Sequence, residues 1–448
     1  MYGPIVKPFE LLGSSFDCRC GRRHTVPTGR LHYGPEAYDL LLETAGSITA
    51  GRKFLIIADE RTEVVAGKAV AEVLQKSGAK VRKCVVPDRG KESPMADDAT
   101  RDWILDRTAD ADLLFAVGSG VINDLTKWVA FLKKRPFVTV ATAASMNGYA
   151  SANVAATVGG LKVLFPAKAC HAVFAHPETI VGAPAELSTA GLGDVLAKSV
   201  SSADWKLNRL LFDDYYCQFS VDLLKDIEPV YLENPTGMKE KDPAAFKALF
   251  QALFLSGIAM TITGTSAPAS GGEHLISHTL DMLAIRDGAA HDLHGRQVGV
   301  ASILMAALYE RAMRIDRPTF GPVPRNVDGK FWGTLSPVVE KEYAKKRPKM
   351  EQARSFLSNA KNWEMVKSQI EPGLIPAEKL KSCLASAGAA HCFWHLKDNE
   401  TELHREKMVS VVNRANQMRE RFTILDLAVM MGLIPGETEE LVDKWITN

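Results

Sequence analysis

Residues 113–124 read LLFAVGSGVIND, an apolar run that ends in a glycine turn and continues into a helical pattern. Buried strands of parallel sheets are near-continuous apolar runs, and residues 113–118 fit that description. Glycines at a strand-to-helix turn let the backbone approach a pyrophosphate, whose charge is favoured by the N-terminus of the helix. The third glycine of a full G-x-G-x-x-G is replaced by Asn123, so a purely structural turn is an equal alternative.

Similar patterns surround this stretch in the first 185 residues. We expect three further strands, at residues 54–59 (FLIIAD), 81–86 (VRKCVV) and 137–142 (FVTVAT). Helical patterns lie between them at residues 64–77 and 122–132, and Gly159-Gly160 indicates a hairpin over residues 154–165. Alternation of strands and helices predicts a parallel α/β sheet.

The character of the sequence changes after Pro184. Strand signals nearly vanish, and helical patterns cover residues 186–211, 244–263, 273–285 and 297–313. We therefore predict a nucleotide-type α/β domain over residues 1–184 and an all-helical domain over residues 185–448.

Bulk composition excludes several classes of protein. The 448 residues are 46% hydrophobic and 24% charged, with 54 Lys and Arg against 53 Asp and Glu. This balance gives no electrostatic reason to expect DNA, RNA or an anionic membrane as a partner. The N-terminus lacks the pattern of a signal peptide, and the apolar stretch 250–262 is too short to span a bilayer. We expect a soluble cytoplasmic protein.

Seven cysteines are scattered along the chain, which is typical of reduced thiols. Cys18-Arg19-Cys20 is the only close pair. Its single intervening residue is too few for the usual zinc spacing, and no second pair completes a site. We interpret these cysteines as structural or incidental thiols.

A group of metal-ligand residue types lies in the helical half. Ser188 is placed to cap a helix that carries Asp194, and a small-residue loop over residues 266–273 leads into His274. His278 follows four residues later on the same helix face, and His294 stands just before another apolar helix. One carboxylate and two imidazoles make a three-ligand metal site with open positions. A lone histidine is usually a core or surface group, but four of the eleven fall between residues 274 and 294.

Polar residues also stand at the ends of two predicted strands. Thr142 and Ser145 follow one strand, and Asp59 ends another. Such residues can line a ligand crevice, and an acid can accept hydrogen bonds from an adenine ribose. A plain turn explains the hydroxyl residues equally well, and a helix cap is a slightly better explanation of Asp59.

Several longer motifs occur in a fixed order, and together they resemble the sn-glycerol-1-phosphate dehydrogenase family. They are GSGVINDLTK (118–127), TAASMNGYAS (142–151), AGLGDVLAK (190–198), SADWKL (202–207), PASGGEHLISH (268–278) and HGRQVGV (294–300). Residues 419–433 (RERFTILDLAVMMGL) resemble the C-terminal helix of the bacterial branch. This family belongs to the superfamily of dehydroquinate synthase and the iron-containing alcohol dehydrogenases.

The resemblance implies a dehydroquinate synthase-like fold whose active site lies between two domains. These are a Rossmann-like nucleotide-binding domain over residues 1–184 and an all-helical metal- and substrate-binding domain over residues 185–448. It implies NAD or NADP, and one divalent metal, zinc or nickel and possibly iron. It also implies metal-dependent reduction of dihydroxyacetone phosphate to sn-glycerol 1-phosphate in a cytoplasmic homodimer. The implied cofactor contacts are Asp59, Gly118, Ser119, Gly120, Val121, Ile122, Asn123, Asp124, Thr142, Ser145 and Ser151. Asp194, His274 and His294 match the metal ligands, and Asn147, Asp194 and His278 match the substrate contacts, with Asp194 and His278 as the catalytic pair.

Two departures bear on the substrate. Many relatives carry aspartate at the position of Asn147, and we expect many to carry a basic or polar residue at the position of Ala267. Asparagine keeps an acceptor but loses the charge and any base function. Three alternatives stay open: a dehydrogenase for another polyol or a phosphonate, a dehydroquinate synthase-like cyclase, and a catalytically dead binding subunit.

Overall fold

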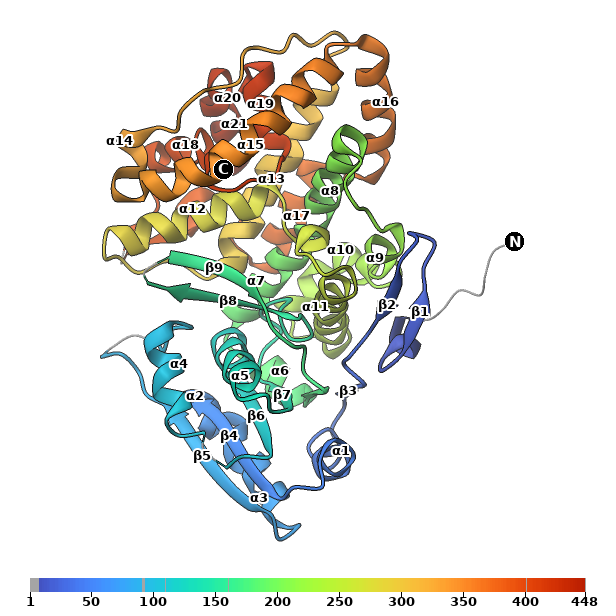
Figure 1. Ribbon diagram of the computed structural model, residues 1–448, viewed down its shortest axis with the longest axis vertical. Coiled ribbons are helices and arrows are strands. Elements are labelled where there is room, and N and C mark those ends of the chain that lie inside the picture. Colours follow the sequence, from blue (N-terminus) through green and yellow to red (C-terminus); the bar gives the residue numbers. More distant parts are fainter. Residues whose placement is uncertain (1–7, 91–92, 109, 160, 400, 448) are drawn as a thin grey trace. The chain divides into compact units, whose positions relative to one another are not determined.

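The computed structural model describes residues 8–90, 93–108, 110–159, 161–399 and 401–447 (Figure 1). The prediction that the N-terminus is not a signal peptide falls partly on residues 1–7, which lie outside the described residues. The chain forms two compact units. The first comprises Met1–Gly191 and Gln218–Thr265, and the second comprises Leu192–Cys217 and Ser266–Asn448. The chain passes from one unit to the other three times, after residues 191, 217 and 265. The domains predicted from the sequence have a single boundary, at residue 184.

A six-stranded sheet forms the centre of the first unit, in the order β3-β10-β7-β6-β4-β5. Every neighbouring pair is parallel. The strands are β3 (Arg30–Tyr33), β4 (Lys53–Asp59), β5 (Lys80–Val86), β6 (Leu113–Gly118), β7 (Phe137–Ala141) and β10 (Ala172–Ala175). The four expected strands are confirmed as β4 to β7. The sequence did not reveal β3 and β10, which have only four residues each.

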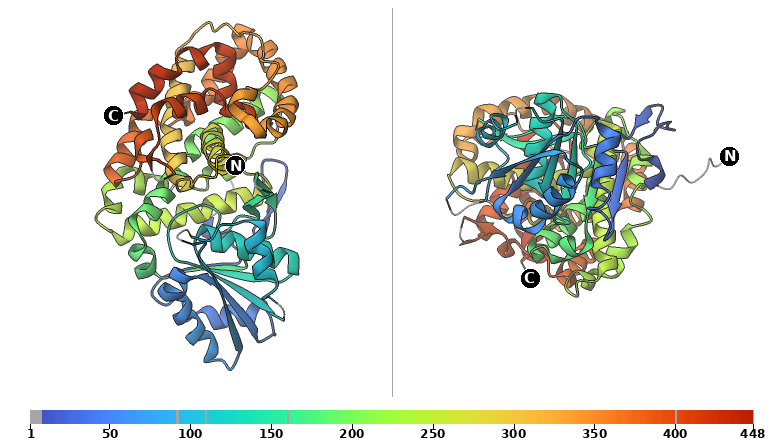
Figure 2. Two further views of the ribbon diagram at one scale, coloured as in Figure 1. Left: turned by 90° about the vertical axis from the view of Figure 1, so that its left-hand side faces the viewer. Right: turned by 90° about the horizontal axis from the view of Figure 1, so that it is seen from below.

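Helices cover both faces of this sheet (Figures 1 and 2). Alternate residues of β4 (54, 56 and 58) and of β6 (113, 115 and 117) pack with Leu41 of α1 and Leu74 of α3. The intervening strand residues are buried as well, and α5 packs on the sheet. Burial on both sides explains the continuous apolar runs. The helices of the first unit are α1 (Leu41–Ile48), α2 (Glu60–Thr62), α3 (Lys68–Gln75), α4 (Asp98–Leu105), α5 (Gly120–Lys133), α6 (Pro177–Gly182), α9 (Gln218–Asp222), α10 (Glu228–Glu233) and α11 (Pro243–Thr263).

The strand order reverses at β4. From β4 the chain moves to β5 on one side and then returns to β6 on the other. Ile57 is paired with Ala116, and Gly118 is paired with Ala141, so Asp59, Gly118 and Thr142 stand at one edge of the sheet. Ligands of open parallel sheets bind outside the carboxyl ends of the strands at such a reversal.

Two hairpins and a long apolar helix complete the first unit. The expected hairpin is confirmed as β8 (Asn153–Val158) with β9 (Leu161–Pro166), and a second one joins β1 (Ser15–Asp17) to β2 (Arg23–Thr25). By length and composition α11 is apolar enough to cross a membrane, with mean hydropathy 1.6. Within the protein, however, 83% of that window is buried, so α11 serves as a core helix.

The second unit is helical, and its one described strand pair, β11 (Lys397–Asp398) with β12 (Thr401–Glu402), is minimal. Its helices are α8 (Lys198–Phe212), α12 (Gly272–Arg286), α13 (His294–Met313), α14 (Gly329–Trp332), α15 (Ser336–Leu357), α16 (Ala360–Ile370), α17 (Ala377–Ala387), α18 (Arg405–Val412), α19 (Ile424–Met431), α20 (Leu433–Gly436) and α21 (Thr438–Ile446). The helix α13 is central, because it packs against α8, α12, α17, α19 and α21.

One predicted helix needs correction. The pattern over residues 186–211 is two helices, α7 (Ala185–Leu196) and α8, which meet at Ala197. The proposed cap at Ser188 is wrong, because α7 already begins at Ala185. Ser188 lies one turn inside, and its buried hydroxyl has no hydrogen-bond partner among the described residues.

Candidate functional site

Three helices of the second unit bring Asp194, His274 and His294 together. Asp194 comes from α7, His274 from α12 and His294 from the first residue of α13. One ligand atom from each lies within 4.8 Å of the others, and His274 Nε2 is 3.7 Å from Asp194 Oδ1. Asp194 and His274 are buried, whereas His294 is half-buried. The cluster predicted from the sequence therefore exists as a spatial group.

Glycines allow α7 and α13 to approach closely enough for this arrangement. A β-carbon at Gly193 would lie 2.1 Å from the carbonyl oxygen of Gly295 and 3.1 Å from Cα of Gly299. No side chain fits into that space. The backbone contact places Asp194, the next residue of α7, beside His294 at the start of α13.

Each imidazole is oriented by a hydrogen bond at Nδ1. Glu273 Oε1 lies 2.7 Å from His274 Nδ1. Ser277 Oγ donates to Gln297 Oε1 at 2.7 Å, and it therefore accepts from His294 Nδ1, which is 2.9 Å away. Both contacts leave Nε2 available, which is how metal-ligating histidines are typically held. None of these three positioning residues was predicted from the sequence, although Glu273 directly precedes His274 and offered a signal.

The electrostatic setting favours a neutral imidazole at His274. Burial lowers the pKa of His274 to about 4, against the opposing effect of Asp194, and Arg419 and Arg421 lower it further. Burial raises the pKa of Glu273 to about 7. A carboxylate with two oriented imidazoles is a donor set that fits zinc, nickel or iron in a site with open positions.

His278 lies beside the cluster without being one of the three grouped ligands. Its ring stacks on His294 with centroids 5.4 Å apart, and it meets His274 edge-on at 5.9 Å. His278 is half-buried. The fourth histidine of the region, His291, instead faces Asp281 at 3.4 Å.

In the first unit, the glycine turn forms the start of α5. Ser119 is the N-cap residue and makes no capping hydrogen bond with its side chain, and α5 begins at Gly120. The first amides of a helix have no partner within the helix, so those of Gly120, Val121 and Ile122 are donors for an anion. A β-carbon at Gly118 would lie 2.7 Å from Cβ of Ile122, which explains the need for glycine.

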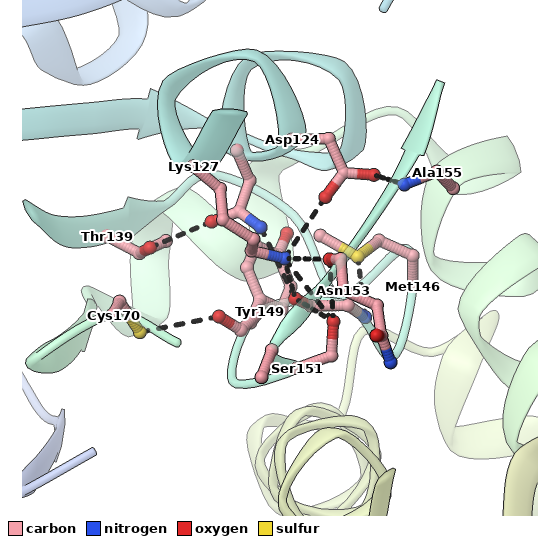
Figure 3. Close-up of polar contacts among 12 residues, drawn as sticks. Asp124, Lys127, Thr139, Met146, Tyr149, Ser151, Asn153, Ala155 and Cys170 are labelled. Atoms are coloured by element: carbon pink, nitrogen blue, oxygen red, sulfur yellow. Dashed lines mark hydrogen bonds and ion pairs between the residues drawn. The ribbon is translucent and has the colours of Figure 1, made fainter. Parts of the chain in front are cut away.

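Three of the expected cofactor residues use their side chains within the first unit (Figure 3). Asn123 accepts from Thr139 at 2.8 Å, and Asp124 accepts from Lys127 Nζ at 3.1 Å and from the amide of Ala155 at 3.2 Å. The fully buried Lys127 also contacts Ser151 Oγ at 3.3 Å. These side chains hold the segment 146–155 in place, so a cofactor would meet the backbone of the turn instead.

The remaining expected residues lie at or near the same sheet edge. Asp59 caps α2, because its Oδ1 accepts from the amides of Arg61 at 2.9 Å and Thr62 at 2.8 Å. This agrees with the capping interpretation and leaves Asp59 Oδ2 for a ligand. Thr142 is buried directly after β7, and Ser145 hydrogen-bonds to the buried Tyr149. Asn147 belongs to the segment 146–155, and a β-carbon on Gly257 of α11 would lie 2.7 Å from its carbonyl oxygen.

Comparisons with known proteins agree with this architecture. Residues 34–184 match the family model of iron-containing alcohol dehydrogenases. The glycerol-1-phosphate dehydrogenase (NAD(P)+) of Halalkalibacterium halodurans is 32% identical over 309 residues, covering 68% of this chain and 76% of that protein. The enzyme of the same name from Bacillus licheniformis is 29% identical and covers 94% of this chain and 93% of its own.

A solved structure shows the same fold. Glycerol dehydrogenase from Schizosaccharomyces pombe superposes with a TM-score of 0.60 at 15% identity, covering 93% of this chain and 91% of that one. The expected fold, a Rossmann-like sheet with a helical C-terminal part, is thereby confirmed. The length of the sequence match and the shared fold together show that this chain belongs to the glycerol-1-phosphate dehydrogenase family and is a dehydrogenase of the iron-containing alcohol dehydrogenase group.

Proposed function

We propose that the protein catalyses the reversible, metal-dependent reduction of dihydroxyacetone phosphate to sn-glycerol 1-phosphate with NADH or NADPH. The observation that carries the proposal is the group of Asp194, His274 and His294, whose ligand atoms lie within 4.8 Å of one another. The names of the relatives support a phosphorylated polyol and a nicotinamide cofactor.

A divalent cation held by these three residues would polarise the substrate carbonyl and so assist hydride transfer. Glu273 and Ser277 keep both imidazoles aimed through their Nδ1 hydrogen bonds. His278, whose ring stacks on His294, is the group that we assign to proton transfer at the substrate oxygen. Asn147 serves as a neutral hydrogen-bonding group towards a substrate hydroxyl.

The cofactor is assigned to the first unit. The amides at the N-terminus of α5 suit a pyrophosphate, and the reversal of strand order places Asp59 and Thr142 at the same edge. Comparing KM for NADH with KM for NADPH identifies which of the two cofactors the enzyme prefers.

Two arginines support a substrate that carries a phosphate. Arg421 donates to Ser266 Oγ at 3.2 Å and to the carbonyl of Ser270, next to the position where Ala267 lacks a basic side chain. Arg419 makes no hydrogen bond or ion pair within the described part of the chain, and burial and Arg421 lower its pKa to about 10. A half-buried guanidinium without an anion, close enough to affect His274, is suited to bind one.

The phosphate assignment predicts a substrate-dependent effect of Arg419→Leu. Hydrogen bonds to charged groups contribute about 1.5–3 kcal/mol, so KM for dihydroxyacetone phosphate should rise roughly 10- to 100-fold. KM for dihydroxyacetone, which lacks the phosphate, should not change. Arg419→Lys should restore part of the affinity for dihydroxyacetone phosphate. Equal losses with both ketones would show that Arg419 has only a structural role.

Oxidation of NADH and NADPH with a panel of ketones tests the reaction itself. We expect turnover with dihydroxyacetone phosphate in zinc- or nickel-loaded protein, and none after Asp194→Asn or His294→Ala. A cyclase would give product without net change in NADH, and a binding subunit would retain metal without turnover. Full activity of metal-free protein would contradict the proposal.

We further propose that the enzyme works in the cytoplasm. All seven cysteines lie outside disulfide bonds, as expected in a reducing compartment. The homodimer implied by the resemblance stays a prediction, which light scattering of the purified protein tests directly.

A further inference from the structure

The close cysteine pair of the sequence lies in the turn of the hairpin formed by β1 and β2. Phe16 pairs with His24 across the strands. The amide of Cys18 donates to the carbonyl of Arg22 at 2.9 Å, and Gly21 closes the turn with φ +83°. This turn folds Cys20 back towards β2, where its Sγ lies 3.3 Å from His24 Nε2.

A fourth side chain joins this group from far along the sequence. Ligand atoms of Cys18, Cys20, His24 and Cys217 all lie within 4.8 Å of one another. Cys217 is bonded to Gln218, the first residue of α9 and of the returning part of the first unit. That part is anchored to the hairpin, because Phe219 packs on Phe16 with ring centroids 5.1 Å apart. Because Gln218 and Phe219 belong to the first unit, the peptide bond to Gln218 keeps Cys217 beside the hairpin.

We propose that Cys18, Cys20, His24 and Cys217 bind a structural zinc ion. Ligands on a tetrahedron around zinc, with bonds of about 2.3 Å, are about 3.7 Å apart, so the observed group needs only a small contraction. Three thiolates and one imidazole form a recognised structural set. Four protein ligands leave no open position, which separates this site from the three-residue group around Asp194.

The surroundings of His24 match those of a zinc ligand. His24 is only 1% exposed, and its ring hydrogen-bonds to the backbone of Ile262 in α11 while Nε2 faces the sulfur. Such a backbone contact fixes the orientation of a ligating imidazole. Zinc with three thiolates carries one negative charge, and Arg19 and Arg22 in the turn provide compensating positive charge.

A physical need for such an ion is evident. The hairpin has only three residues in each strand and forms a two-stranded sheet of its own. Hairpins of this size are marginal in water without further support. Zinc would join both arms of the hairpin to the start of α9. The free energy of zinc binding then becomes folding free energy of this segment.

Cobalt substitution tests the site independently of the proposed enzymatic function. Protein loaded with Co²⁺ should show a sulfur-to-cobalt charge-transfer band in the near ultraviolet, together with the visible bands of tetrahedral cobalt. The group around Asp194 contains no sulfur, so His294→Ala should leave the charge-transfer band unchanged. Absence of the band in wild-type protein that binds cobalt would overturn the proposal.

Variants locate the thiolate ligands. Cys217→Ser should lose the charge-transfer band and one bound zinc per chain, as should His24→Ala, whereas His24→Cys should retain both because a four-cysteine set also binds zinc. The matched control is Cys392→Ser, because Cys392 stands with His391 and His395 in the other described group that contains a thiol. Loss of the band in Cys392→Ser but not in Cys217→Ser would show that the metal binds at Cys392, and it would refute the proposal.

Alkylation of the native protein provides a readout that does not require the variants to fold. Cys18, Cys20 and Cys217 should be protected from iodoacetamide until a chelator is added, as measured by mass spectrometry of the peptides. Rapid alkylation of Cys18 and Cys20 in protein of full zinc content would contradict the site. So would a disulfide between any two of these cysteines in freshly isolated protein.

Discussion

Single hydrogen bonds decide which imidazole nitrogen faces the metal cluster. Ser277 connects His294 Nδ1 to Gln297, so two hydrogen bonds in series hold the ring of His294 on its Nδ1 side. Glu273 does the same for His274 directly. These contacts determine the tautomer of each ring, and with it the availability of Nε2.

Removing the hydroxyl should weaken metal binding without unfolding the protein. We expect Ser277→Ala to lower zinc affinity about 10- to 100-fold, the usual cost of losing such a contact. Competition with a chromogenic chelator measures this affinity. Ser302→Ala is the matched control, because Ser302 is also a buried serine, but its hydroxyl donates to the carbonyl of Val298 within α13. Equal zinc affinities in both variants would contradict the role of Ser277.

Packing of α7 against α13 depends on glycine at residues 193 and 299. We expect Gly193→Ala to force the two helices apart, since its methyl group would lie 2.1 Å from the carbonyl oxygen of Gly295. Overpacking of this kind costs about 1–3 kcal/mol, and the separation should also lower metal affinity by moving Asp194 from His294. Urea unfolding and metal titration measure the two effects. Gly182→Ala should change neither, because nothing lies within 4 Å of its added β-carbon.

A buried ion pair connects α15 to α19 in the second unit. Lys346 and Asp426 are both fully buried and 3.1 Å apart, and burial lowers the pKa of the lysine and raises that of the aspartate. Lys346→Met should destabilise the protein by about 3–5 kcal/mol, because it leaves the carboxylate unpaired. Adding Asp426→Asn should recover part of this loss. The neighbouring Lys345→Met should cost about 0–1 kcal/mol, because its pair with Glu342 is exposed.

Elements with a strong period were predictable, whereas those that depend on distant contacts were not. The apolar runs indicated β4, β6 and β7, and the spacing of His274 and His278 indicated one helix face. The four-residue strands β3 and β10 carry no pattern of their own, since pairing along the sheet stabilises them. Likewise, Ala197 separates α7 from α8 although alanine favours helix, so packing overrides local preference there.

At the scale of the whole chain, the sequence showed the residue types of the candidate site but not the contacts that join them. Asp194, His274 and His294 were named because carboxylates and imidazoles are metal ligands. Gln297 gave no signal because it acts through Ser277, and Arg419 gave none because only folding brings it near His274. The group around Cys18 shows the same limit, since Cys217 lies nearly two hundred residues further along the chain.

The distribution of sites over the two units predicts which segments each ligand protects from hydrogen exchange. All candidate cofactor residues belong to the first unit, and the Asp194 group belongs to the second. Ligand binding suppresses the local opening that permits hydrogen exchange at the elements that form the site. NADH should therefore slow amide exchange in residues 118–124 and 142–151. Zinc added to metal-stripped protein should slow exchange in residues 192–196, 272–278 and 294–299, and in the hairpin at residues 15–25. Mass spectrometry of the exchanged peptides checks both patterns, and protection of the glycine turn by zinc alone would contradict the assignment of separate binding elements.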